Sequence, residues 1–191
     1  MSEDITVWGA PDRHPELIPE DSPLRDLFRF CVRRAFHETL GVSEAQIGAY
    51  IADLLADFAH VDNMYSLRGA NGRRLREVAE MLADADVRLS GSSFEHEREV
   101  HRRIGDFTLF WGGIYPEALT RLRAPGTPDS LIDYVRQGKM SYYIVSTFDH
   151  GRFGREAALF RQLSAEFELY QYGLSLVRRE WERMSRSGLP Y

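Results

Sequence analysis

Large apolar side chains recur at alternating steps of three and four residues near the end of the chain. The repeat comprises Phe160, Leu163, Phe167, Tyr170, Leu174, Val177, Trp181 and Met184. A spacing that averages 3.5 residues places them on one stripe of a helix that packs lengthwise against other helices, whereas a strand would require alternation at every second residue. The pattern predicts one long helix that begins near Gly154 and ends before Gly188.

Three shorter helices are predicted nearer the start of the chain. Ser22 is placed to cap, and Pro23 to open, a helix that ends at Gly41. Ser43 is expected to begin a second helix, which is apolar on one face as far as residue 61. A third helix follows the glycine-containing turn at 69–72 and ends near residue 91.

The segment 92–123 changes character along its length. Its first half carries a single apolar stripe, but in its second half Leu109 lies opposite that stripe and Phe110 beside it. A helix that is apolar on nearly all sides is buried at the centre of a fold. Pro116 is expected to kink or restart this helix.

The segment 128–149 is open to two interpretations. Its apolar pattern is interrupted at Gly138 and Lys139, so the segment forms either one helix or two. Residues 142–148 also have a strand-like composition, rich in aromatic and β-branched side chains. We favour helix, because no second strand-like run is present to pair with this one.

Together these segments predict an all-α protein. We expect a single-domain bundle of about six helices with a long C-terminal helix, formed by residues 24–187. Residues 1–23 contain four prolines, which deny a helix its backbone donors, and are therefore expected to form an extended N-terminal arm. Residues 188–191 form a short C-terminal tail.

Composition and charge exclude several classes of protein. The chain of 191 residues is 43% hydrophobic and 28% charged, and its longest apolar run, 107–115, is far shorter than the roughly 20 residues of a membrane helix. Glu3 and Asp4 lie where a secretory signal would carry positive charge, so we expect a cytoplasmic protein. The net charge is −5 and the arginine pairs are each surrounded by acids, so we do not expect a nucleic-acid partner.

The densest polar cluster contains Glu95, His96, Glu97, Glu99 and His101, followed by Asp106. On a helix, Glu97 and His101 lie one turn apart, a spacing that lets both ligate one metal ion or lets the carboxylate orient the imidazole. Further along this flank, Gly105, Thr108 and Gly112 predict a groove of small residues in which a ligand can approach closely. The alternative is a helix–helix contact through the glycines, with Glu97 and His101 forming a solvated pair.

A second candidate metal site contains Asp57 and His60. An acid three residues before a histidine is the spacing that di-iron helical bundles use on two of their helices. Here the spacing occurs once, with Asp in place of Glu, and both side chains lie to the solvent side of their apolar stripe. The sequence thus permits a metal cofactor at Asp57 and His60 or at Glu97 and His101, but it does not require one.

The final segment also carries a second apolar line, opposite the first, formed by Ala158, Ala165, Leu169, Tyr172 and Leu176. A helix that is apolar on two sides must be covered on both, and another molecule is one source of cover. No complete catalytic or phosphate-binding motif is present in the sequence. The leading hypothesis is therefore a non-catalytic protein that associates through Leu169, Tyr172 and Leu176, as a homodimer or as an accessory subunit of an assembly.

The alternative hypothesis is a helical-bundle enzyme or sensor that binds a metal, a haem or a flat organic ligand. In that case His101 would be a metal ligand or general base, and Glu97 would orient it. Tyr115 would donate a hydrogen bond, and the ligand would lie in the groove between Gly105 and Gly112.

Overall fold

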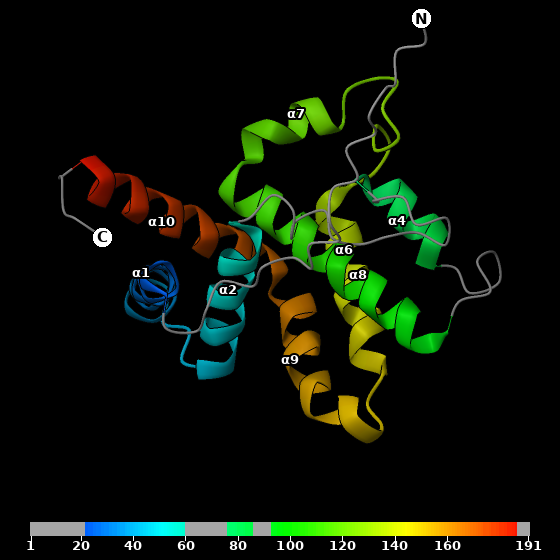
Figure 1. The fold of residues 1–191 in the computed structure, drawn as a ribbon, viewed down its shortest axis with the longest axis horizontal. Helices are drawn as coiled ribbons and strands as arrows, with labels where there is room; N and C mark the ends of the chain where they lie inside the picture. Colours follow the sequence, from blue (N-terminus) through cyan, green and yellow to red (C-terminus); the bar gives the residue numbers. More distant parts are fainter. Residues whose placement is uncertain (1–21, 60–75, 86–92, 187–191) are drawn as a thin grey trace, which may run out of the picture.

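The computed structural model describes residues 22–59, 76–85 and 93–186 (Figure 1). All regular secondary structure in these three ranges is helical, which confirms the predicted all-α class. Within the same residues, no helix is both long and apolar enough to cross a membrane. The predicted arm, up to residue 21, and the predicted tail lie outside the described residues.

The described helices follow one another without an intervening strand. In chain order they are α1 (Pro23–Val32), the π-helix η1 (Arg33–Thr39), α2 (Ala45–Phe58), α4 (Val78–Ala85), α6 (Phe94–Ile114), the 3-10 turn η2 (Pro116–Ala118), α7 (Leu119–Leu122), α8 (Tyr134–Thr147), the 3-10 turn η3 (Gly151–Phe153), α9 (Gly154–Ala165) and α10 (Phe167–Arg186). Helix α6 crosses the centre of the molecule, and α2, α4, α8 and α10 pack against it (Figure 1). The prediction of a central, buried fourth helix is confirmed.

The first helix begins where the sequence predicts, but it changes to the π-helix η1 at Arg33 before the predicted stop at Gly41. The Oγ atom of Ser22 accepts a hydrogen bond from the backbone N–H of Leu24 at 3.3 Å, and Gly41 adopts a φ of +71° after the last turn. The second start signal was wrong, because the N-cap of α2 is Glu44 rather than Ser43, and the side chain of Glu44 makes no capping bond.

Cys31 lies in the core, where burial raises the pKa of its thiol to about 11.

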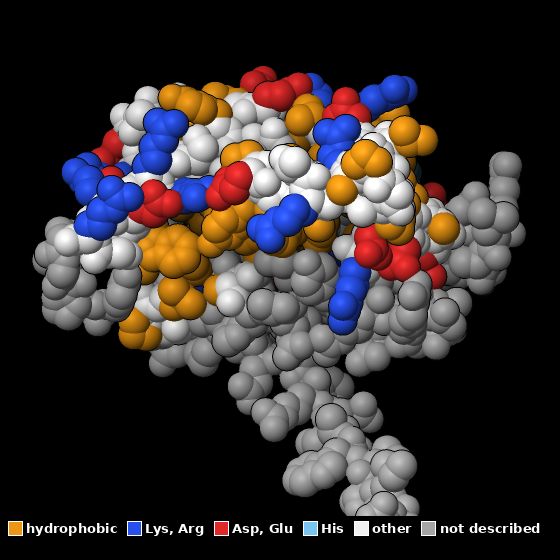
Figure 2. Space-filling model, turned by 90° about the horizontal axis from the view of Figure 1, so that it is seen from above, with side chains coloured by type: hydrophobic (Ala, Val, Ile, Leu, Met, Phe, Trp, Pro, Cys, Tyr) orange, Lys and Arg blue, Asp and Glu red, His pale blue; other side chains and the backbone are white. Residues whose placement is uncertain are grey.

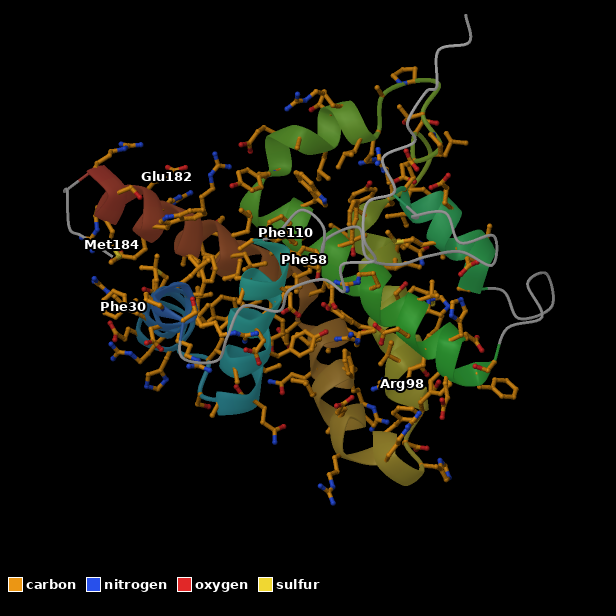
Figure 3. The ribbon with its side chains drawn as sticks, viewed as in Figure 1. Phe30, Phe58, Arg98, Phe110, Glu182 and Met184 are labelled. Carbon is orange, nitrogen blue, oxygen red and sulfur yellow. The ribbon has the colours of Figure 1, made fainter. Side chains whose placement is uncertain are left out.

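Helices α2 and α6 meet through aromatic side chains. The rings of Phe58 and Phe110 lie edge to face with their centroids 5.0 Å apart (Figure 3). The guanidinium of Arg103 lies over the Phe58 ring of this pair, 5.4 Å from its centroid. Pro116 restarts the chain after α6 as a 3-10 turn, as predicted.

The segment 128–149 contains one helix, α8, rather than two. Gly138 lies buried inside it and does not interrupt it. A Cβ atom at this position would collide with the ring of Phe167 and would lie 2.5 Å from Oγ1 of Thr108. The interruption in the apolar pattern therefore marks a close helix contact and not a helix end.

The long C-terminal helix is present as α10, but it starts later than predicted. Glu166, with φ −104° and ψ 27°, ends α9, and α10 starts at Phe167. Helix α9 packs mainly on α8, whereas α10 packs on α6, η1 and α1, and the two run in different directions in Figure 1. Of the eight residues in the repeat, six are buried and Trp181 and Met184 are half-buried. The repeat therefore reported burial correctly but did not reveal the break.

Two helical glycines offer a direct test of these contacts. Gly138→Ala should lower the free energy of unfolding by about 1–3 kcal/mol, because the added methyl group overpacks the junction of α8, α6 and α10. Gly48→Ala should raise it by roughly 0.5–1 kcal/mol, because the nearest atom to its new Cβ, Cγ1 of Val32, is 3.9 Å away and alanine favours a helix interior. Urea denaturation of both variants measures the difference, and effects of the same sign would contradict this packing.

Candidate functional site

His101, the main sequence-predicted site residue, is buried on α6 and faces α8. Its Nδ1 atom lies 3.2 Å from Oγ of Ser141, which also accepts a hydrogen bond from Nε2 of Gln137 at 3.1 Å. Burial lowers the pKa of His101, so the ring is neutral at neutral pH. Among the described residues the polar partner of this ring is Ser141, and Glu97, one turn earlier, does not orient it.

The predicted groove of small residues is occupied by side chains of the protein itself. A Cβ atom at Gly105 would collide with the ring of Tyr142 from α8, and one at Gly112 with the amide group of Gln171 from α10. The hydroxyl of Thr108 donates to the backbone oxygen of Ile104 at 2.8 Å. The structure thus uses these positions for helix–helix contacts, which was the alternative to a ligand groove.

Tyr115 lies too far from His101 to act on the same ligand. The two are 14 residues apart on one helix and its cap, which corresponds to about 21 Å along the helix axis. The Tyr115 ring instead packs against Phe110 and Trp111, and the guanidinium of Arg178 lies 5.2 Å from its centroid.

The predicted metal ligands are not assembled in the part of the chain that the structure describes. Asp57 is half-buried on α2, with its Oδ1 atom 3.8 Å from Nη2 of Arg25. His60 lies outside the described residues. Within those residues, no group of three His, Cys, Asp or Glu side chains is placed to hold a metal ion.

The predicted interface residues of the last helix do not share one environment. Leu169 and Leu176 are half-buried and pack against the core of this chain. Tyr172, between them in sequence, remains 51% exposed. The second apolar line is therefore covered in part by this chain itself. Of the three predicted interface residues, Tyr172 is the most exposed.

A polar centre that sequence reasoning did not assemble lies at Asp106 of α6. The residue is 3% exposed, and its Oδ1 accepts hydrogen bonds from the hydroxyl groups of Tyr50 at 2.5 Å and Tyr142 at 2.8 Å. Nη1 of Arg102 lies 3.9 Å from Oδ2. One carboxylate thereby joins α2, α6 and α8 inside an aromatic layer that also includes Phe160.

The titration of this centre reflects its removal from water. Burial raises the pKa of Asp106, against the opposing effects of Arg102, Arg103 and the two hydroxyl donors. Burial also raises the pKa values of Tyr50 and Tyr142, and the charge of Asp106 adds to this. Both phenols therefore remain protonated and keep donating to the carboxylate over the whole physiological range. The arrangement ties three helices together through one buried carboxylate.

Arg98, one turn before His101, is a second buried polar residue that sequence reasoning missed (Figure 3). Its guanidinium lies 4.3 Å from the ring centroid of Phe153, and Nη2 is 2.6 Å from a carboxylate oxygen of Glu156. Its Nε atom has no hydrogen-bond partner among the described residues. This side chain attaches the start of α9 to α6, so its role is one of packing and charge pairing.

Surface charge is mixed in sign. On the face presented in Figure 2, basic and acidic side chains are interspersed over the described part of the molecule, and no extended basic region is visible there. A duplex-binding surface needs such a region to displace counterions. The visible charge distribution thus gives no support to a nucleic-acid site on that face.

The Asp106 centre predicts a specific dependence of stability on pH. Because the folded-state pKa exceeds the ordinary value of 3.8, the folded chain binds an extra proton between 3.8 and that raised pKa. The contribution of Asp106 to the free energy of unfolding therefore falls as pH rises through this window. Asp106→Asn keeps an acceptor for the tyrosines but does not titrate. Urea denaturation at a series of pH values measures the free energy of unfolding of both proteins. The wild-type free energy minus that of the variant should decrease as pH rises, and an increase would refute the assignment.

Comparison with known proteins assigns no family to these features. Neither the protein-family models, nor the curated proteins, nor the solved structures contain a match to this chain.

Proposed function

We propose that the protein acts by protein–protein association, as a homodimer that forms through an exposed surface shared by α8 and the start of α10. The observation that carries this proposal is the exposure of three large side chains, Met140, Tyr143 and Tyr172, on two helices joined by an ion pair. We call this surface the α8–α10 patch. Two of the three, Met140 and Tyr143, line a groove together with Asp133, Val135, Arg136, Lys139, Ser164 and Glu168. Tyr172, one turn beyond Glu168 on α10, is added to the patch as its exposed neighbour outside the groove.

The apolar part of the patch is accessible and grouped. Met140 is 48% and Tyr143 56% exposed, and a separation of three residues places them on the same face of α8. They line a shallow groove of about 490 Å³ that also includes Val135. Grouped exposed apolar side chains are typical of association sites, whereas isolated ones are common on any surface.

An ion pair continues the surface from α8 to α10. Nζ of Lys139 lies 2.9 Å from both carboxylate oxygens of Glu168. Tyr172 follows Glu168 by one helical turn and therefore lies on the same side of α10. Tyrosine and methionine are enriched at interface cores, and charged residues at the rim, which matches this arrangement.

Charge supports a second copy of the chain as the partner. The patch carries Arg136 and Lys139 together with Asp133 and Glu168, so its charges balance. In a two-fold contact the same surface serves both subunits, and basic groups of one copy meet acidic groups of the other. A partner with a strongly basic or acidic face would find no complementary field here.

The alternative of an enzyme or sensor at His101 has weaker support. Ser141 pairs with Nδ1 of the imidazole, and Gln137 donates a hydrogen bond to Ser141. Tyr142 and Gln171 fill the space beside Gly105 and Gly112. An accessory role in a larger assembly would use the same patch, and a chain that is monomeric in isolation would favour it over a homodimer.

The association is tested by placing charge in the patch. Met140→Glu combined with Tyr143→Glu should weaken the dimer by roughly a hundredfold, because both carboxylates would be desolvated in an apolar contact. Native mass spectrometry and light scattering should show a monomer, while circular dichroism shows unchanged helicity because both side chains are already half-exposed.

The matched control is Phe94→Glu, which introduces one glutamate at a 72% exposed aromatic position at the start of α6, outside the patch. This variant should remain dimeric. A wild-type chain that stays monomeric in the high micromolar range, or a doubly substituted chain that stays dimeric, would show that the patch is not a homodimer interface.

A further inference from the structure

A cavity of about 380 Å³ lies where η1 turns into α2, on helices other than those of the α8–α10 patch. Sites for small ligands commonly measure about 300–1,000 Å³ and are mostly apolar, with a few polar groups that fix orientation. This cavity has that composition. Its lining comprises Arg29, Val32, Arg33, Phe36, His37, Val42, Ser43, Glu44, Ala45, Gly48 and Ala49.

The floor of the cavity is apolar and contains unfilled space. Val32 and Phe36 belong to the buried core, and Gly48 faces Val32 from α2. An added Cβ atom at Gly48 would find its nearest neighbour at 3.9 Å, whereas at Gly105 and Gly138 another side chain occupies that space. Gly48 is thus a helical glycine that leaves room beside the core.

One wall of the cavity is cationic. Arg29, Arg33 and His37 follow one another at steps of four residues and all line it. The two guanidinium groups pair with acids outside the cavity, Arg29 with Asp26 at 3.4 Å and Arg33 with Glu38 at 3.0 Å. Exposed pairs of this kind contribute at most about 1 kcal/mol, so their arginines can turn toward a competing anion.

The opposite wall contributes less charge. Glu44, exposed at the N-cap of α2, is the acid among the lining residues, against two guanidinium groups. The segment that carries Arg33 and His37 is π-helical, with Leu40 N–H bonded to the carbonyl of Ala35 at 3.1 Å. π-helical turns are rare in proteins overall, but those that occur are often found at functional sites.

We propose that this cavity binds a small anionic amphiphile, a monocarboxylate with an apolar body. The carboxylate pairs with Arg33 and Arg29, for which planar guanidinium groups are suited. The apolar body lies over Val32, Phe36 and the open position at Gly48, where its burial supplies most of the affinity.

Isothermal titration calorimetry with sodium decanoate, below the concentration at which it forms micelles, tests this assignment. We expect saturable one-to-one binding in the micromolar range, and at least about tenfold weaker binding of the uncharged analogue decanol. Arg33→Gln should weaken decanoate binding by about tenfold or more and leave decanol binding unchanged. Arg123→Gln, at an exposed arginine after α7, is the matched control and should bind decanoate as the wild type does.

Variants that fill the cavity provide a second test of ligand binding. Ala49 is exposed at the rim, so Ala49→Phe should fold normally and abolish binding of both probes, and Gly48→Leu should do the same from the floor. The Met140→Glu, Tyr143→Glu variant should bind decanoate as the wild type does, which separates this test from that of the dimer. Absence of saturable binding, equal affinity for decanol and decanoate, or unchanged binding by Ala49→Phe would overturn the proposal.

Discussion

Close approach between α6 and α8 is the constraint on which the rest of the fold depends. Gly105 and Gly138 lack the side chains that would hold the two helices apart, and the ring of Tyr142 and the hydroxyl of Thr108 take that space. Interiors packed at this density transmit a displacement rather than absorb it. Because α2, α4 and α10 also pack on α6, a change at this junction reaches each of these helices.

The same approach brings a polar group into the core and gives it partners. Asp106 accepts hydrogen bonds from Tyr50 and Tyr142, which reach it from α2 and α8. Sliding α8 by one turn, about 5.4 Å, would remove the Tyr142 hydroxyl and leave a buried carboxylate with fewer donors. Apolar side chains alone tolerate such slips far better, so this centre disfavours alternative registers of the three helices.

Local signals in the sequence were sufficient for several helix ends and insufficient for the site. The cap at Ser22, the stop at Gly41 and the restart at Pro116 each depend on a few neighbouring residues, and all are present in the structure. The donors to Asp106 are 56 and 36 residues away in sequence, so no spacing along one helix identifies them.

His101 illustrates the same limit on sequence reasoning. Glu97 was the expected partner because it is one turn away, but the neighbouring helix supplies Ser141 instead. An aspartate on the inner side of an apolar helix was the one available hint to the polar centre.

The break at Glu166 divides the repeat between two sets of neighbours, α9 with α8 and α10 with α6, η1 and α1. A continuous helix would transmit the melting of one set directly into the other, since each turn is bonded to the next. A non-helical residue between them relieves that coupling, and local opening in proteins follows such cooperative units. Amide hydrogens of α9 and of α10 can thus exchange with solvent through separate openings, at rates set by different packing partners, although only one residue separates the two helices.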